Sequence, residues 1–346
     1  MEIKKRKLYD TKAPNKSTGI VNGESSNILN WDDIAYPFAR RFYKAMMKNF
    51  WRPEEIDMSA DRMQFPTLPE AEQDTFKKII GLLAFLDSVQ SDYTMRVADF
   101  ITDSSLNATM ITLSQQEVIH NESYTYTLSS LVNSDEQHRI FNYWRTDKVL
   151  RKRNDFLAKG YEEFTDNPSL KTLLRSVVYD VILEGLFFYS GFAFFYNLAR
   201  NQKMLATAKM INFINRDEQQ HVGLFCNIYK QILLENKQID REEMEKFAIE
   251  TFKRAAEYEM AWADYIIGNR IEGISVKDVH SYVKFIANKR VRELGYGNER
   301  VFPGYTQSPL KWIKVYEDNS LGKADFFETK VSSYNKVSKN NGFDQL

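Results

Sequence analysis

The sequence predicts an all-α protein built as a bundle of long helices. Apolar residues recur at helical spacing through several long stretches, and most of these stretches begin with a pattern typical of a helix N-terminus. No stretch alternates apolar and polar residues with a period of two, as a half-buried strand would. The chain has 346 residues, of which 43% are hydrophobic, and this is enough for one large core or two modest ones.

The overall composition gives no sign of two classes of partner. Lys and Arg together number 47, as do Asp and Glu, so the bulk charge indicates binding to neither nucleic acid nor an anionic membrane. The single cysteine, Cys226, excludes an internal disulfide and fits a reducing compartment. The N-terminus is charged and lacks the apolar segment of a secretory signal. We therefore expect a cytoplasmic protein.

Capping signals and breaks define the first elements. Residues 1–30 are polar and are expected to form a flexible N-terminal arm. An amphipathic helix is predicted over residues 31–50. The capping-box spacing of Thr67-Leu-Pro-Glu70 then predicts a long helix over residues 70–100, and another long helix is predicted over residues 105–131.

The middle of the chain predicts a polar helix and then a strongly apolar one. Ser134 begins the polar helix, whose basic run over residues 148–153 is most simply a solvated face. An Asn-Pro pair begins the apolar helix at 168–199. Its apolar character raises the question of a membrane span, but Asp180 and Glu184 interrupt it, and charges in the middle of a bilayer are costly. We interpret it as a buried helix of a soluble protein.

The last third of the chain predicts three more helices and a tail. The helices cover residues 202–235, about 240–267, and a stretch that begins at Ser275 and ends at Gly295. From residue 317 onward the composition changes to Asp, Asn, Ser, Gly and Lys, which is typical of a flexible tail. We therefore expect one helical domain over residues 31–316 and a tail over residues 317–346.

Two Glu-x-x-His turns lie within these helices. Glu117 and His120 occupy one long predicted helix, and Glu218 and His221 occupy another. Residues three apart share a helix face, so each turn aims a carboxylate and an imidazole at the same point. One such pair is common on solvated helices. Two copies in a chain with only four histidines indicate a shared site.

Two further carboxylates lie where few basic partners are available. Asp87 and Glu184 each occupy a predicted helix that is apolar on most sides, and an unpaired buried carboxylate is costly or takes up a proton. Buried salt bridges are the alternative, but a nearby residue such as Arg216 could serve one carboxylate and not four. A pair of metal ions neutralises all four carboxylates, as in four-helix di-metal proteins, and this ligand set suits iron or manganese.

With these residues in place, the chain resembles the small, radical-generating subunit of class I ribonucleotide reductase. The resemblance extends from about Trp51 to Tyr334. It implies a ferritin-like helical bundle with extra helices and a central dinuclear metal site, with iron as the default metal and manganese as the alternative. Six residues match the metal ligands of that family in order and spacing: Asp87, Glu117, His120, Glu184, Glu218 and His221.

The resemblance also implies a route for a radical. Tyr124 lies four residues after His120 and matches the radical tyrosine of the family. Trp51 and Asp217 match the tryptophan and the carboxylate that connect the metal site with the surface. Tyr334 resembles the mobile tyrosine of the family's tail. Three apolar residues match the pocket around the radical tyrosine: Phe188, Phe192 and Ile214.

A large catalytic subunit is the implied partner. Reduction of a ribose needs reactive thiols, and a chain with one cysteine cannot supply a dithiol, so ribonucleotides would be reduced on the large subunit. The tail ends in Phe343 and Leu346, and we expect it to dock onto that subunit. The chain is also expected to form a homodimer. The sequence leaves open the choice of metal, the need for a flavodoxin-like activase, and whether the oxidant rests on Tyr124 or on the metals.

Three alternative functions share parts of this pattern. A di-iron oxidase or oxygenase of the same fold would have no use for Trp51, Asp217 or a tyrosine in the tail. A ferritin-like iron-storage protein is normally much shorter and needs no apolar radical pocket. A structural helical protein with buried ion pairs would bind no metal, and metal analysis of the purified protein would identify it.

Overall fold

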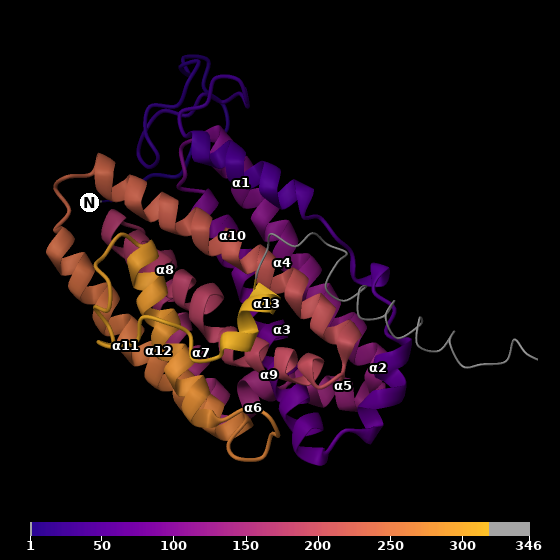
Figure 1. Cartoon of the computed structure of the whole chain (residues 1–346). Helices are drawn as coiled ribbons and strands as arrows, with labels where there is room; N and C mark the ends of the chain where they lie inside the picture. The colour runs from indigo at the N-terminus through magenta and orange to yellow at the C-terminus, as the bar shows by residue number, and fades with distance from the viewer. Residues whose placement is uncertain (1, 318–346) are drawn as a thin grey trace, which may run out of the picture.

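The structure is a computed structural model that describes residues 2–317. Within this range the chain forms thirteen α-helices, three 3₁₀ turns and one π-helical turn, with one isolated β-bridge between Glu2 and Ser169. The longest helices run along a common direction and give the molecule an elongated shape (Figure 1). The all-α prediction is therefore confirmed.

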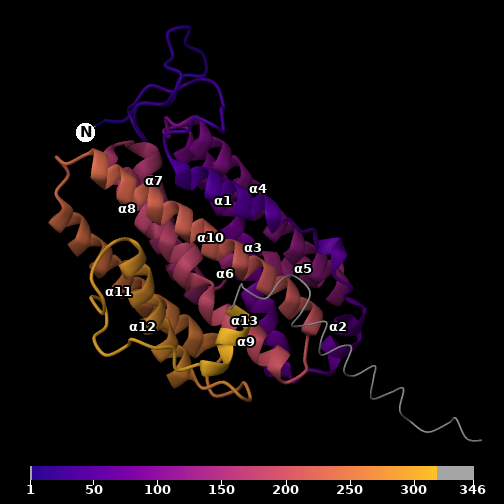
Figure 2. The same ribbon diagram turned by 45° about the horizontal axis from the view of Figure 1, so that its top comes forward.

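Long helices form the centre of the bundle. They are α3 (Glu70–Ala98), α4 (Ser104–Leu131), α8 (Leu170–Ile182), α9 (Tyr189–Arg200) and α10 (Leu205–Glu235). α3 and α4 pack along much of their length, and α10 packs against both α8 and α9. α1 (Pro37–Lys48) lies beside α4 and α10, as both views show (Figure 1, Figure 2).

Further helices cover the other side of α8. α7 (Lys148–Asp166) and α11 (Arg241–Ile266) both pack on α8, and α12 (Val276–Glu293) packs on α11 (Figure 2). Ser275 caps α12, and Gly295 follows it with a φ of 103°, as predicted for a helix end. The remaining helices are short: α2 (Ser59–Gln64), α5 (Ser134–Phe141), α6 (Tyr143–Thr146) and α13 (Lys314–Glu317).

One predicted helix start and one predicted helix cap were wrong, although α3 begins at the predicted residue. α1 begins at Pro37 rather than at residue 31, because proline is pre-organised for the first helical position. The capping box predicted at Thr67 does not form. The Thr67 hydroxyl instead donates to the Gln64 carbonyl at 2.7 Å within a 3₁₀ turn, and α3 begins at Glu70 after Pro69.

The polar helix predicted from Ser134 is divided into α5, α6 and α7. Asn133 caps α5, and Asp147 caps α7 through the Val149 and Leu150 N–H groups. The basic run was expected to be a solvated face, but Arg153 is 1% exposed and lies 2.6 Å from Glu259 on α11. The prediction is corrected at this residue, because its partner lies on a helix that local sequence could not place beside it.

The N-terminal segment lies outside the helices, as predicted, yet it is attached to the bundle. Ile3, Ile20 and Val21 are buried. The Thr102 N–H donates to the Ile20 carbonyl at 2.8 Å, just before α4 begins. At these points the segment is anchored, which differs from the loose arm that its polar composition suggested.

The segment Leu170–Arg200 is long and apolar enough to cross a membrane, and the 18-residue stretch that meets this criterion is entirely buried inside the protein. It is not one continuous helix. A π-helical turn, Leu183–Phe187, separates α8 from α9 and carries Glu184. Such turns are rare and occur frequently at functional sites.

Candidate metal centre

Six buried side chains converge in the middle of the bundle. They come from four segments, namely α3, α4, the π turn and α10. All six are completely excluded from solvent: Asp87, Glu117, His120, Glu184, Glu218 and His221. The structure thus brings together every residue that the sequence predicted as a metal ligand.

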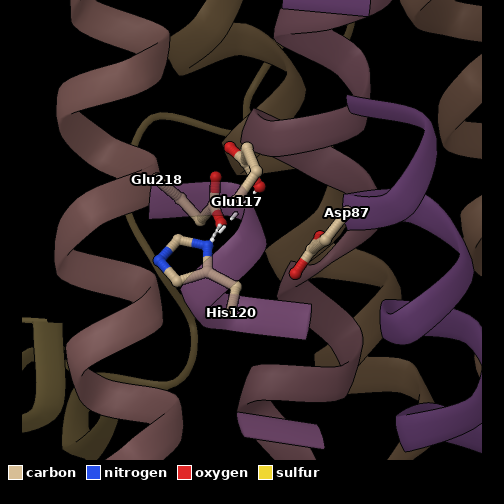
Figure 3. A group of neighbouring side chains, drawn as sticks. All are labelled: Asp87, Glu117, His120 and Glu218. Atoms are coloured by element: carbon tan, nitrogen blue, oxygen red, sulfur yellow. Dashed lines mark ion pairs between the residues drawn. The ribbon is translucent and has the colours of Figure 1, made fainter. Parts of the chain in front are cut away.

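The six side chains form two overlapping groups. In the first, ligand atoms of Asp87, Glu117, His120 and Glu218 lie within 4.8 Å of one another, and Figure 3 shows these side chains pointing toward a common centre. The second group contains Glu117, Glu184, Glu218 and His221 within the same distance. Glu117 and Glu218 belong to both groups, so these two carboxylates could serve two neighbouring cations.

The α4 half of the site follows from regular helix geometry. α4 is unbroken over 28 residues, and the Asp103 carboxylate accepts from the Ser105 and Leu106 N–H groups at its start. Without an interruption, Glu117 and His120 lie on one face, one turn apart. The α10 half repeats the same spacing with Glu218 and His221.

Ion pairs link the imidazoles with the shared carboxylates. His221 Nδ1 lies 2.8 Å from Glu117 Oε1, and His120 Nδ1 lies 3.0 Å from Glu218 Oε1. Burial by itself would raise the pKa of Glu117, but the two imidazoles outweigh it and lower this pKa to about 2. Burial opposes the charge on His221, yet Glu117 raises the pKa of His221 to about 10.

Asp87 and Glu184 are compensated less: Glu184 Oε1 lies 3.8 Å from His221 Nδ1, and the charge of His120 only partly offsets the burial of Asp87. Burial, together with the charges of neighbouring carboxylates, raises the pKa of both well above the usual range. Within residues 2–317, neither Asp87 oxygen has a hydrogen-bond partner of good geometry, and the same holds for Glu184 Oε2. Buried oxygens without partners are costly. Cations would neutralise these charges and accept these lone pairs, so the residues present fit a pair of metal ions.

A chain of contacts leads from His120 to Trp51. His120 Nε2 lies 3.4 Å from Asp217 Oδ2, and the same oxygen accepts from the Trp51 indole N–H at 2.9 Å. Arg216 donates to the other Asp217 oxygen at 3.0–3.1 Å. Trp51 is 1% exposed, and its ring stacks at 6.2 Å from that of His120. The resemblance implied one route through Trp51, Asp217 and His120, and in the structure these residues form one connected group.

Tyr124 lies one turn beyond His120 on α4 and is 1% exposed. Burial, and then the charge of Asp87, raises the pKa of Tyr124 far above the usual range, so the phenol is neutral. Phe188 and Phe192 are buried with ring centres 5.7 Å apart, and Ile214 is buried as well. Tyr334 and the end of the tail lie outside the described residues.

Three supporting residues escaped the sequence analysis. Gln90 on α3 donates to Asp180 Oδ1 at 2.6 Å and to Glu184 Oε1 at 2.5 Å, and its carbonyl accepts from the Tyr161 hydroxyl at 2.9 Å. Asp180 is fully buried one turn before Glu184, so the argument from carboxylates stranded in apolar helices could have found it. Gln116 was also missed, and its Oε1 lies 3.0 Å from His221 Nε2.

The His120–Asp217 and His221–Gln116 contacts have a common consequence. Each fixes the orientation of an imidazole, so that Nδ1 faces the centre of the site while Nε2 is held outside it. Partners of this kind orient metal-binding histidines and raise their basicity. The geometry therefore includes both the candidate ligands and the groups that orient two of them.

Comparison with known proteins agrees with this geometry. The family model "Ribonucleotide reductase, small chain" matches residues 28–309. A ribonucleoside-diphosphate reductase subunit beta from Halalkalibacterium halodurans is 59% identical over 345 residues, which cover 100% of this chain and 99% of the relative.

Solved structures show the same likeness. The ribonucleotide reductase R2 subunit from Clostridium botulinum is 36% identical with a TM-score of 0.88, and the match covers 92% of this chain and all of that one. A dimanganese(II)-NrdF from Streptococcus sanguinis, at 24% identity and a TM-score of 0.69 over 80% of this chain and 96% of that one, shares the fold. The chain belongs to the small-chain family of ribonucleotide reductases.

Proposed function

We propose that this chain is the radical-generating beta subunit of a ribonucleoside-diphosphate reductase, and that Tyr124 carries the radical. One observation carries the proposal: two four-ligand groups share Glu117 and Glu218, and the buried Tyr124 lies one turn from His120. A metal pair at this site would supply the oxidising power to remove one electron and one proton from a phenol. Iron is the default metal, and manganese is the alternative.

The surroundings of Tyr124 suit storage of an oxidising equivalent. The side chain is 1% exposed, so water and reductants are excluded. Phe188, Phe192 and Ile214, all buried, are proposed to line its pocket with groups that neither donate nor accept protons. The neutral phenol keeps its proton until oxidation, because burial disfavours the phenolate.

The route out of the site runs through the connected group of His120, Asp217 and Trp51. The Trp51–Asp217 hydrogen bond of 2.9 Å holds the indole in a fixed position beside the site. We propose that Tyr334 continues this route on the tail, which docks onto a large catalytic subunit. The single cysteine, Cys226, is buried, so this chain exposes no thiol for ribose reduction, and that chemistry belongs to the partner. A homodimer, and a flavodoxin-like activase for loading the centre, complete the proposed assembly.

Replacement of Tyr124 by Phe tests the radical assignment. Metal binding and fold should remain, while the organic radical signal in low-temperature electron paramagnetic resonance and the reductase activity should disappear. Tyr126→Phe is the matched control, because Tyr126 lies on the same helix and its hydroxyl donates to the Ile56 carbonyl at 3.0 Å, not to a candidate ligand. Full activity in Tyr124→Phe would show that the metals hold the oxidant.

Truncation tests the tail separately. Removal of the residues after Asn340 should abolish binding to the large subunit and leave the Tyr124 radical intact, as measured by co-sedimentation and resonance spectroscopy. Tyr334→Phe should have the opposite result, with the complex preserved and nucleotide reduction stopped. Normal binding by the truncated chain would contradict the tethering role.

A further inference from the structure

The π turn Leu183–Phe187 is the least regular part of the site. Its sequence, Leu-Glu-Gly-Leu-Phe, contains no proline and nothing else that enforces a departure from the α-helix. A π turn gives up regular backbone hydrogen bonds and is rarely stable by itself. Contacts from other helices must therefore maintain it, and two buried arginines supply them.

Arg290 from α12 contacts the turn directly after Glu184. Its Nε donates to the Gly185 carbonyl at 2.9 Å, and its Nη1 donates to Glu293 at 2.7 Å. Its Nη2 donates to the Tyr189 hydroxyl, at the first residue of α9. The side chain is 2% exposed. The guanidinium therefore joins the π turn, the start of α9 and α12 in one rigid contact.

Gly185 is required for this approach. A Cβ at residue 185 would lie 2.8 Å from Arg290 Nε and 3.0 Å from its Cδ. No real Cβ tolerates so short a contact, so any side chain at this position would displace the guanidinium. The residue that follows the ligand Glu184 is thus a glycine for reasons of packing.

A second arginine holds the other end of the turn. Arg153 from α7 donates to the Phe187 carbonyl and also to Glu259 on α11, at 2.6 Å. Glu259 accepts in turn from the Ser190 N–H, at 3.4 Å, and from the Ser190 hydroxyl. One buried ion pair therefore supplies a donor to the end of the π turn and an acceptor to the first turn of α9.

These contacts should affect the metal position beside His221 more than the one beside Asp87. Glu184 belongs only to the group with His221, whereas the group with Asp87 and His120 contains no residue of the π turn. A change in the backbone at Gly185 would move Glu184 and leave the Asp87 side chain where it is.

We propose that Arg290 and the Arg153–Glu259 pair are positioning residues that hold the π turn, so that Glu184 reaches the metal position it shares with His221. The inference rests on the proposed metal pair. In this proposal helices α7, α11 and α12 position one half of the site, although none of them carries a candidate ligand.

Stepwise Mn²⁺ titration of the full-length, metal-free protein tests the proposal, with bound ions counted by equilibrium dialysis and by resonance spectroscopy. The wild type should bind two ions. Arg290→Met should bind one ion with wild-type affinity and the other about tenfold or more weakly, as changes behind metal ligands typically do. Amide hydrogen exchange of the metal-free variant should be faster over residues 183–192.

Three further variants make the test specific. Arg292→Met, at an exposed residue of the same helix, is the matched control and should bind both ions normally. Gly185→Ala keeps Arg290 but displaces it, and should behave like Arg290→Met. When Glu184 is already replaced by Ala, adding Arg290→Met should not weaken metal binding further, because Arg290 acts through Glu184.

The outcomes separate this inference from the proposed function. Equal weakening of both ions in Arg290→Met and Gly185→Ala, or no weakening of either, would overturn the positioning role. If Arg290→Met weakened metal binding further in the Glu184→Ala variant, that result would also overturn the positioning role. If Arg290→Met does not fold, Gly185→Ala decides in its place. A wild-type chain that binds no second ion would overturn the proposed metal pair itself.

Discussion

α4 and the segment α8–α9 both cross the centre of the bundle and serve the same site, but they are built differently. α4 runs without a break from Ser104 to Leu131 and presents two ligands on one face. The α8–α9 segment is interrupted at Glu184 by a π turn. Glu117 on α4 is paired with an imidazole at 2.8 Å, whereas Glu184 accepts from the amide of Gln90.

The difference shows two ways to prepare a buried carboxylate for a cation. Glu117 is already compensated in the metal-free protein, and its pKa is lowered to about 2. Glu184 is compensated less, since its contact with His221 is 3.8 Å long, and burial raises its pKa well above the usual range. The first half is arranged by its own helix and by the neighbouring imidazoles. The second half depends on contacts from α3, α7, α11 and α12.

The largest effect is expected from replacing Glu117, which belongs to both groups, rather than Glu184, which belongs to one. Glu117→Ala should abolish binding of both ions, because Glu117 belongs to both groups. Glu184→Ala should lose one ion and retain the other, with a loss of affinity that exceeds the roughly 10–100-fold typical of groups behind the ligands. Metal quantification after dialysis measures the difference. Loss of both ions in Glu184→Ala would remove the distinction between the two halves.

The stability of the metal-free protein should change in opposite directions. Glu117→Gln breaks a buried ion pair and should lower the free energy of unfolding by about 3–5 kcal/mol. Glu184→Gln replaces a carboxyl group that, in the buried site, must either hold a disfavoured charge or take up a proton. A carboxyl with a raised pKa destabilises the fold progressively as pH rises through that pKa, so the neutral amide should stabilise by about 1 kcal/mol or more at neutral pH.

Urea unfolding in the presence of a chelator measures both changes. The same experiment with metal present should reverse the sign for Glu184→Gln, because the loaded protein loses a ligand. A Glu184→Gln variant that is destabilised without metal would mean that Gln90 compensates the carboxylate fully.

A smaller effect is expected from the amides that support each half. Gln90→Leu leaves Asp180 and Glu184 without the donor that both now share. We expect a loss of about 1–3 kcal/mol of stability and about tenfold weaker binding of one ion. Gln116→Leu removes one contact to His221 and should weaken metal binding without affecting Glu184. Calorimetric titration with metal measures how each variant binds ions. Identical binding by the two variants would contradict the difference expected between the two halves of the site.

The smallest effect should come from the helix caps. Asp103 caps α4 and Ser169 caps α8, and replacement of either by Ala should cost about 1 kcal/mol. Neither cap touches a ligand, so the number of bound ions should stay at two in both variants. Thermal unfolding and metal analysis test this, and loss of an ion in Ser169→Ala alone would show that the broken helix transmits changes along its length.

The sequence by itself predicted which residues gather at the candidate metal centre. The spacing of Glu117 with His120, and of Glu218 with His221, is a property of any α-helix, so both pairs could be placed before the structure was known. Asp87 and Glu184 were recognisable because buried carboxylates without partners are costly wherever they occur. Both arguments use only local geometry and elementary solvation. The long central helices could be predicted from local sequence for the same reason.

Only the tertiary structure decided how the ligands are held. The π turn at Glu184, the burial of Arg153 and the contact of Gln116 with His221 have no local signal, because each depends on a helix far away in the chain. Arg290 and Gly185 are separated by 105 residues, and nothing near either residue indicates the other. Helical periodicity is set by hydrogen bonds between close neighbours in sequence, whereas these contacts exist only after packing has brought distant helices together.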